Sequence, residues 1–216
     1  MSHRPLNIAE IRMDYSREAL DEQATGDDPM HFFMKWFSEA ESAQITEVNA
    51  MTLATVDADH RPHARIVLLK GADERGFSFF TNYDSAKGTH IAADPFVALL
   101  FFWKELERQV RIDGRIEKLP AAESDEYFYS RPVGSRLGAW ASPQSREIPG
   151  REVLEQNYER YQKEFGENVP RPPHWGGYLV VPQRIEFWQG RSSRMHDRIS
   201  FSRNEDGSWK RCRLAP

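Results

Sequence analysis

The chain has 216 residues, of which 39% are hydrophobic and 29% charged, with a formal net charge of −4 and one cysteine. This length suits one domain with a sizeable core, the single cysteine excludes an internal disulfide, and the negative net charge argues against a nucleic-acid partner. The start of the chain has no signal-peptide pattern and no run approaches the ~18–20 apolar residues of a membrane span, so we expect a cytoplasmic protein without a membrane partner.

Residues 1–28 are mostly polar and predict a mobile N-terminal arm in front of one domain over residues 29–216. From Pro29 onward, apolar residues recur at i, i+1, i+4, i+5 and i+8, which is the pattern of one face of an amphipathic helix. The residues on this face are Phe32, Phe33, Trp36, Phe37 and Ala40.

Beyond residue 50 the apolar pattern changes to period two, which is typical of strands. The first expected strands are 50–57, 62–70, 76–81, 96–103 and 107–119, with a short helix over 84–95 capped by Asp84 or Ser85. Helices follow at 120–130, 132–140 and 150–165, and then strands at 177–182, 184–188, 198–202 and 208–214. Strands at both ends with helices between them predict a mainly β fold with peripheral helices, in the form of a closed antiparallel barrel.

Two basic residues bound the expected strand segment R-I-V-L-L-K, residues 65–70. In an extended strand Arg65 and Lys70 lie on opposite faces, so they either serve different sites or are solvated at the strand ends. The segment T-N-Y-D-S-A-K-G, residues 81–88, places Lys87 in the first turn of a helix. Backbone N–H groups there favour an anion, although a plain helix cap has the same composition.

Tyr127, Arg131 and Ser135 are spaced by four residues, but Pro132 interrupts the helix that would align them. We therefore expect Tyr127 and Arg131 at the end of one helix and Ser135 in the opening turn of the next. A phenol, a guanidinium and a hydroxyl near a helix N-terminus suit a phosphate monoester. A surface helix break with an exposed arginine is the alternative.

Residues 190–198, G-R-S-S-R-M-H-D-R, contain three arginines and a histidine. In an extended segment Arg194, His196 and Arg198 would alternate onto one face, whereas a solvated basic loop is the alternative. Gln109, on an expected strand, either reads the edge of a heterocycle or lies on a solvated face. The other histidines are scattered without the spacing of metal ligands, so we expect no metal site.

Several of these segments together resemble the pyridoxamine 5′-phosphate oxidase family. The shared motifs run in one order from about residue 11 to Pro216: R-I-V-L-L-K, F-F-T-N followed by S-A-K, L-E-R-Q-V, Y-F-Y-S-R-P, W-G-G, I-E-F-W-Q-G, R-M-H-D-R and R-L-A-P. The resemblance implies an FMN-binding split barrel, FMN as cofactor and a homodimer with flavin at the subunit interface. It also implies an oxidoreductase that converts pyridoxamine or pyridoxine 5′-phosphate to pyridoxal 5′-phosphate and reduces O2 to H2O2.

The resemblance assigns site residues by position. Flavin contacts fall on Arg65, Ile66, Val67, Leu68, Leu69, Lys70, Phe80, Thr81, Lys87, Gln109, Gln144, Ser145, Trp188 and Arg198. Substrate contacts fall on Lys70, Tyr127, Arg131, Ser135, Arg194 and His196, with an arm contribution from Arg12 and Tyr15. The catalytic residues implied are Arg194, which would hold the pyridine ring against the flavin, and His196, which would assist by hydrogen bonding or proton movement.

Two other functions stay open at this point. One is a related split-barrel oxidase or reductase acting on another small molecule, such as a phenazine precursor. The other is a non-catalytic protein that binds flavin or pyridoxal phosphate. A substrate without phosphate would leave Lys70, Tyr127, Arg131 and Ser135 without a role, and the presence of both Arg194 and His196 disfavours a pure carrier.

Overall fold

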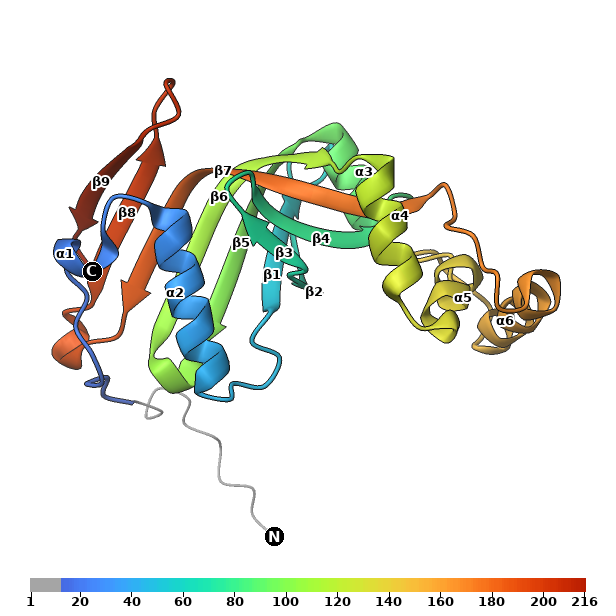
Figure 1. Cartoon of the computed structure of the whole chain (residues 1–216), viewed down its shortest axis with the longest axis horizontal. Helices are drawn as coiled ribbons and strands as arrows, with labels where there is room; N and C mark the ends of the chain where they lie inside the picture. Colours follow the sequence, from blue (N-terminus) through green and yellow to red (C-terminus); the bar gives the residue numbers. More distant parts are fainter. Residues whose placement is uncertain (1–12) are drawn as a thin grey trace, which may run out of the picture.

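The computed structural model describes residues 13–216 and contains one antiparallel sheet (Figure 1). Its strands are β1 (Ala50–Val56), β2 (Pro62–Leu68), β3 (Gly71–Asp73), β4 (Gly76–Asn82), β5 (Phe96–Trp103), β6 (Arg108–Lys118), β7 (Trp175–Gln189), β8 (Asp197–Arg203) and β9 (Trp209–Leu214). The spatial order is β2-β1-β5-β6-β7-β4-β3, while β8 pairs with β7 and β9 pairs with β8. The strands expected from the period-two pattern are therefore present.

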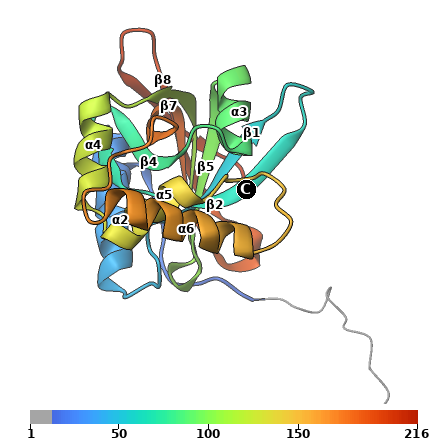
Figure 2. The same ribbon diagram turned by 90° about the vertical axis from the view of Figure 1, so that its right-hand side faces the viewer.

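The helices surround this sheet. They are α1 (Glu22–Thr25), α2 (Pro29–Ser42), α3 (Ala86–Ala93), α4 (Ala121–Ser130), α5 (Val133–Ala141) and α6 (Glu152–Phe165), with short 3-10 turns η2 (Lys104–Leu106) and η3 (Ser192–Arg194). Helix α2 lies across one face of the sheet, whereas α5 and α6 lie at one end of the molecule (Figures 1 and 2). Within residues 13–216, no helix is long and apolar enough to cross a membrane.

A bulge bends the two longest strands. The sequence pattern predicts separate strands at 177–182 and 184–188, but β7 runs through Pro182 without a break. Pro182 lies opposite Gly114, where the register of β6 and β7 shifts, and a bulge tolerates the missing proline N–H. A Cβ on Gly114 would lie 2.4 Å from the carbonyl oxygen of Val181, so only glycine fits there.

The bend lets β7 pair with β4 along its first half and with β8 along its second half. The sheet therefore curls into a half-barrel. Strands β2 and β3 end the strand order and do not pair with each other among the described strands. The expected mainly β barrel with peripheral helices is confirmed, but it is split where the strand pattern alone predicted closure.

The main core lies between α2 and the concave face of the sheet. Asp28 caps α2 by accepting hydrogen bonds from the N–H groups of Met30 and His31. The aromatic face predicted from Pro29 onward is buried except for the half-buried Phe37. The Phe33 ring meets Phe77 and Phe101 at centroid distances of 4.8 and 5.3 Å. A second cluster joins α4 and α5 to the first half of β7, and it contains Phe128, Leu137, Val169 and Trp175.

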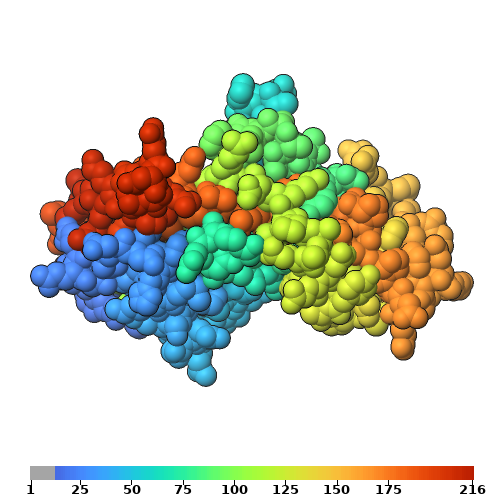
Figure 3. All heavy atoms as spheres, turned by 45° about the horizontal axis from the view of Figure 1, so that its top comes forward, coloured from blue at the N-terminus to red at the C-terminus, as the bar shows by residue number. Residues whose placement is uncertain are grey.

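The segment before α1 is tied to the sheet by polar contacts. Glu107 accepts hydrogen bonds from the backbone N–H groups of Ser16 and Arg17 at 3.0 and 3.1 Å. The buried Arg108 bonds Glu18 at 2.5 Å, and Arg213 of β9 pairs with Glu22 of α1. Figure 3 shows this N-terminal segment against the C-terminal strands. A domain boundary at residue 28 and a mobile arm before it stay predictions.

The Phe33 position gives a test of the core. Phe33 is 0% exposed, so Phe33→Ala removes a ring that the surrounding aromatics cannot replace and should lower the free energy of unfolding by ~3–5 kcal/mol. Its neighbour Met34 is 45% exposed, and Met34→Ala should change that free energy by less than about 1 kcal/mol. Urea denaturation at one fixed protein concentration measures both, and equal effects of the two substitutions would contradict the packing described.

Candidate functional site

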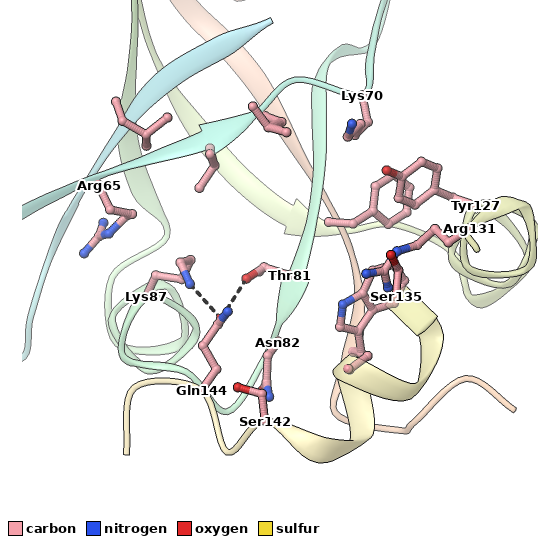
Figure 4. Close-up of a pocket in the computed structure, with 17 residues that line it drawn as sticks. Arg65, Lys70, Thr81, Asn82, Lys87, Tyr127, Arg131, Ser135, Ser142 and Gln144 are labelled. Carbon is pink, nitrogen blue, oxygen red and sulfur yellow. Dashed lines mark hydrogen bonds between the residues drawn. The ribbon is translucent and has the colours of Figure 1, made fainter. Parts of the chain in front are cut away.

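A cavity of about 620 Å³ opens between β2, β4 and the pair α4 and α5 (Figure 4). Its volume lies within the roughly 300–1,000 Å³ of small-molecule sites. The predicted site residues that line it are Arg65, Ile66, Val67, Leu68, Lys70, Phe80, Thr81, Lys87, Tyr127, Arg131, Ser135 and Gln144. Segments that are far apart in the sequence thus contribute to one site.

Arg65 and Lys87 form one basic end of the cavity. The Arg65 guanidinium is fixed by bonds from Nη1 to the Leu53 carbonyl oxygen at 3.0 Å and to the Thr55 hydroxyl at 2.6 Å. Lys87 stands in the first turn of α3, which Ser85 caps, and donates to Oε1 of Gln144 at 2.9 Å. Burial lowers the pKa of Lys87, and the nearby charge of Arg65 lowers that pKa further.

The second basic end lies where α4 meets α5. Arg131 follows the last residue of α4 with extended backbone, and Ser135 lies in the first turn of α5, as the sequence predicts. The Arg131 guanidinium carbon lies 4.7 Å from the ring centroid of Trp175, a cation–π contact. Its Nη1 is buried and has no hydrogen-bond partner among the described residues, and burial lowers the pKa of Arg131.

Tyr127 stacks on Phe80 with ring centroids 4.0 Å apart, and Lys70 Nζ lies 5.9 Å from the Tyr127 centroid. Figure 4 shows Lys70 and Tyr127 beside Arg131, with Arg65 and Lys87 at the other end. As far as the structure describes the lining, it contains no aspartate or glutamate. Cations that lose hydration without an acidic partner favour an anionic ligand, so the cavity suits a molecule or a pair of molecules with two anionic groups.

The geometry corrects one expectation about Arg65 and Lys70. An uninterrupted strand over 62–70 would place them on opposite faces, but β2 ends at Leu68. The chain then turns, and the Lys70 N–H donates to the carbonyl oxygen of Ser78 on β4. Both cations therefore line the same cavity, at different ends of it. Leu69 is 6% exposed and belongs to the main core.

Other predicted residues lie outside this cavity. Gln109, Trp188 and Arg198 are register neighbours across β6, β7 and β8, so they form a row on one face of the sheet. Ser145 follows Gln144 with a backbone φ of 70° and does not line the cavity. Arg12 lies outside the described residues.

A second cavity, of about 470 Å³, is lined by residues of the N-terminal segment and of η3 and its flanks: Met13, Asp14, Tyr15, Arg191, Ser193, Arg194 and His196. The Arg191 N–H donates to Nδ1 of His196 at 3.1 Å, so in the neutral ring the proton is on Nε2. The His196 ring lies 4.6 Å from that of Trp188, centroid to centroid. This group shares no lining residue with the first cavity.

The expected alternation of Arg194, His196 and Arg198 is wrong. Ser193 and Arg194 have positive φ values of 55° and 61° within η3, and β8 begins only at Asp197. A left-handed turn in non-glycine residues is uncommon and breaks strand alternation. Arg194 and His196 still meet at one cavity, whereas Arg198 turns to Glu186 of β7 at 2.8 Å.

The motif-based assignment missed part of the first cavity's lining. The additional lining residues are Asn82, Gly138, Ala139, Ser142 and Trp175. Trp175 opens the W-G-G motif, which was a signal, but the motif does not reveal that its ring lies under Arg131. Within the described part of the chain, no group of three His, Cys, Asp or Glu residues could hold a metal ion.

Comparison with known proteins gives the same family that the sequence motifs resemble. Residues 37–164 match the family described as pyridoxamine 5′-phosphate oxidase, and residues 175–216 match a pyridoxine 5′-phosphate oxidase C-terminal dimerisation region. A pyridoxine/pyridoxamine 5′-phosphate oxidase from Cupriavidus necator is 60% identical over 209 residues, which cover 97% of this chain and 99% of that protein. One from Ralstonia nicotianae is 59% identical, with the same coverage.

Two solved structures resemble the fold. PhzG from Burkholderia lata, in complex with tetrahydrophenazine-1-carboxylic acid, has a TM-score of 0.86 and 30% identity and covers 93% of this chain and 100% of its own. An FMN-binding protein from Nostoc punctiforme, related to pyridoxamine 5′-phosphate oxidase, has a TM-score of 0.70 at 18% identity and covers 88% of this chain and 100% of its own. The predicted split barrel is confirmed. The chain belongs to the pyridoxamine 5′-phosphate oxidase family.

Proposed function

We propose that this protein oxidises pyridoxine 5′-phosphate or pyridoxamine 5′-phosphate to pyridoxal 5′-phosphate at an FMN site. With the alcohol, one O2 is consumed and one H2O2 formed; with the amine, one water is also consumed and one ammonia released. The observation that supports this most is a cavity with two separate basic ends and no acidic lining among the described residues. FMN and the vitamer each carry one phosphate, and each phosphate requires cations and hydrogen-bond donors.

The family assignment supports FMN as the cofactor, and the donor set fits it. In our proposal Arg65 and Lys87 bind the flavin phosphate, since each is already held in place by neutral partners. Lys70, Tyr127 and Arg131 bind the vitamer phosphate together with the Ser135 hydroxyl, and Nη1 of Arg131 is a donor that has no acceptor among the described residues. When bound, FMN supplies acceptance of a hydride equivalent from the substrate carbon and delivery of electrons to O2.

The second cavity supplies the two residues assigned to catalysis, Arg194 and His196. We propose that Arg194 holds the pyridine ring in place and that His196 donates a hydrogen bond from Nε2 or moves a proton at the reacting carbon's substituent. The N–H of Arg191 fixes the tautomer and orientation that this role needs. These groups orient the substrate and do not form a covalent bond to it.

A homodimer brings the two groups of residues together in this proposal. The dimerisation region, residues 175–216, includes Trp188 on β7, Arg194 in η3 and Arg198 on β8. On the sheet, Phe102 is paired with Gln109 and is 52% exposed, and Ile66 on the cavity rim is 64% exposed. Ile66 and Phe102 lie on one face of the sheet, because Thr52 of β1 pairs with both Ile66 and Leu100, and apolar side chains exposed together on one face mark interaction surfaces. A two-fold axis would then place the row and second cavity of one protomer against the first cavity of the other.

The similarity to PhzG supports a second candidate, oxidation of a phenazine precursor. Such a carboxylate needs one anion site beside the flavin phosphate, and it does not need the full group around Arg131. The names of relatives near 60% identity favour the vitamer phosphate. The two candidates differ in which substrate is turned over, so one assay separates them.

The assay uses the purified protein loaded with FMN. Pyridoxine 5′-phosphate and O2 should give the aldehyde and H2O2 in equal amounts, while unphosphorylated pyridoxine at the same concentration should give much less product. Absence of aldehyde with a fully flavin-loaded protein would contradict the proposal. Turnover of tetrahydrophenazine-1-carboxylic acid in its place would establish the second candidate.

Substitutions at the two basic ends of the cavity should affect different ligands. Lys87→Met removes a donor to the flavin phosphate and should weaken FMN binding by roughly tenfold or more. The melting temperature of the flavin-free protein should not fall, because burial and Arg65 already disfavour the lysine charge there.

Arg131→Lys keeps the charge but loses the planar fork, so it should raise the KM for pyridoxine 5′-phosphate roughly tenfold and leave FMN affinity unchanged.

Lys35→Met, on the exposed side of α2, is the control for net charge and should change neither quantity. Flavin fluorescence titration measures FMN affinity, and steady-state kinetics measures KM. If Arg131→Lys weakened FMN binding and Lys87→Met raised only KM, the assignment of the two ends would be reversed.

A further inference from the structure

Glu186 is the most deeply buried carboxylate on the sheet, and it lines neither of the two cavities. Its residue is 2% exposed on β7, two residues before Trp188. Three arginines surround it: Arg198 at 2.8 Å, Arg111 at 3.2 Å and Arg184 at 3.7 Å. A carboxylate loses much hydration free energy on burial and persists only with charged partners.

The hydrogen bonds single out one of these partners. Nε of Arg198 donates to Oε1 of Glu186, and this bond raises the pKa of Arg198. In contrast, Oε2 of Glu186 and Nε of Arg111 have no hydrogen-bond partner among the described residues. Arg184 Nε donates to the Ser200 hydroxyl, and Asp113 lies 3.7 Å from Arg111. Charge neutralisation alone would not require the carboxylate to be aligned with Arg198.

Arg198 is also held at a second point. Its Nη1 donates to the carbonyl oxygen of Ala215 at 2.8 Å, within the R-L-A-P motif. A planar guanidinium with two of its nitrogens fixed has a defined orientation. Its Nη2 has no acceptor among the described residues, and Arg198 is the register partner of Trp188.

We propose that Glu186 is a positioning residue that, with the Ala215 carbonyl, orients Arg198 so that Nη2 meets the flavin. The inference rests on the proposed function, in which Arg198 contacts FMN. It gives a role to the glutamate of I-E-F-W-Q-G and to the alanine of R-L-A-P, which the site described above does not use.

The sign of one effect separates positioning from simple charge. Glu186→Met removes the negative charge and the acceptor at similar side-chain length. If Glu186 acted only through its charge, its loss would make the region more positive and strengthen binding of the anionic flavin. If Glu186 positions Arg198, its loss should weaken FMN binding by about tenfold, the effect of one misplaced charge-assisted hydrogen bond.

A double-mutant cycle on FMN dissociation constants tests the coupling. Flavin fluorescence is titrated with flavin-free full-length protein for Glu186→Met, for Arg198→Ala and for the double variant. The double variant should bind FMN no more weakly than Arg198→Ala alone. Glu186→Gln, which keeps an oxygen for Nε, should recover part of the affinity. Arg184→Gln removes another arginine beside Glu186 and should stay within about twofold of the unmodified chain.

Three results would overturn the inference in distinguishable ways. Tighter FMN binding by Glu186→Met, or an equal loss in the Arg198→Ala background, would contradict positioning while leaving the flavin role of Arg198 intact. Unchanged FMN affinity in Arg198→Ala would contradict that flavin role itself.

Arg198→Lys keeps the test decisive if Glu186→Met does not fold. Lysine retains the charge but has one nitrogen, and it cannot bond Glu186 and Ala215 while reaching the flavin. It should therefore lose nearly as much FMN affinity as Arg198→Ala. Full retention of affinity by the lysine variant would show that charge alone is sufficient.

Discussion

The burial of cations that have no acidic partner among the described residues is the constraint on which the site depends. Arg65, Lys70, Lys87 and Arg131 share one cavity whose described lining has no carboxylate. Burial lowers the pKa of Arg65, Lys87 and Arg131, because each charged group loses hydration, and a bound anion would compensate for that loss. The fold holds these cations with neutral groups: the Leu53 carbonyl, the Gln144 amide and the Trp175 ring. An acidic partner in their place would compete with an anionic ligand.

The bulge at Gly114 and Pro182 decides which residues can meet within one chain. It bends β7, so that its first half pairs with β4 beside the first cavity and its second half carries Trp188 toward β8. The residues of the first cavity therefore lie around the first half of β7. The row that contains Trp188 and the second cavity lie at its second half (Figure 1). A dimer is the proposed means of joining them, and the orientation of Arg198 by Glu186 would then prepare one protomer for the flavin of the other.

The sequence predicted much of this because its periodic signals are local. The α2 face from Phe32 to Ala40 follows from spacing and the helix break follows from Pro132, and both are confirmed. Tertiary contacts decided what spacing could not. The bulge opposite Gly114 absorbed Pro182 into one strand, and the turn after Leu68 brought Lys70 to the same cavity as Arg65. The left-handed residues Ser193 and Arg194 likewise replaced the expected alternation with a turn.

Motifs identified the chemistry of the site better than its geometry. The helix cap before Lys87 and the proline after Arg131 predict that both residues lie at helix ends. The stacking of Arg131 on Trp175, however, joins residues 44 positions apart and leaves no local pattern. The same holds for Glu186, whose role depends on neighbours in β6 and β8 and on the Ala215 carbonyl. Such cross-strand partners are set by register, which a single sequence does not encode locally.

Subunit complementation tests the central claim, a site shared between two protomers. Arg131→Ala disables the first cavity and Arg194→Ala disables the second, so each variant alone should have little activity at low substrate concentration. Equal co-expression gives mixed dimers in which one of two sites combines an intact Arg131 with an intact Arg194. The account predicts recovery of about a quarter of the unmodified activity for random pairing. No recovery, with mixed dimers demonstrated by mass spectrometry, would show that each site is contained within one chain.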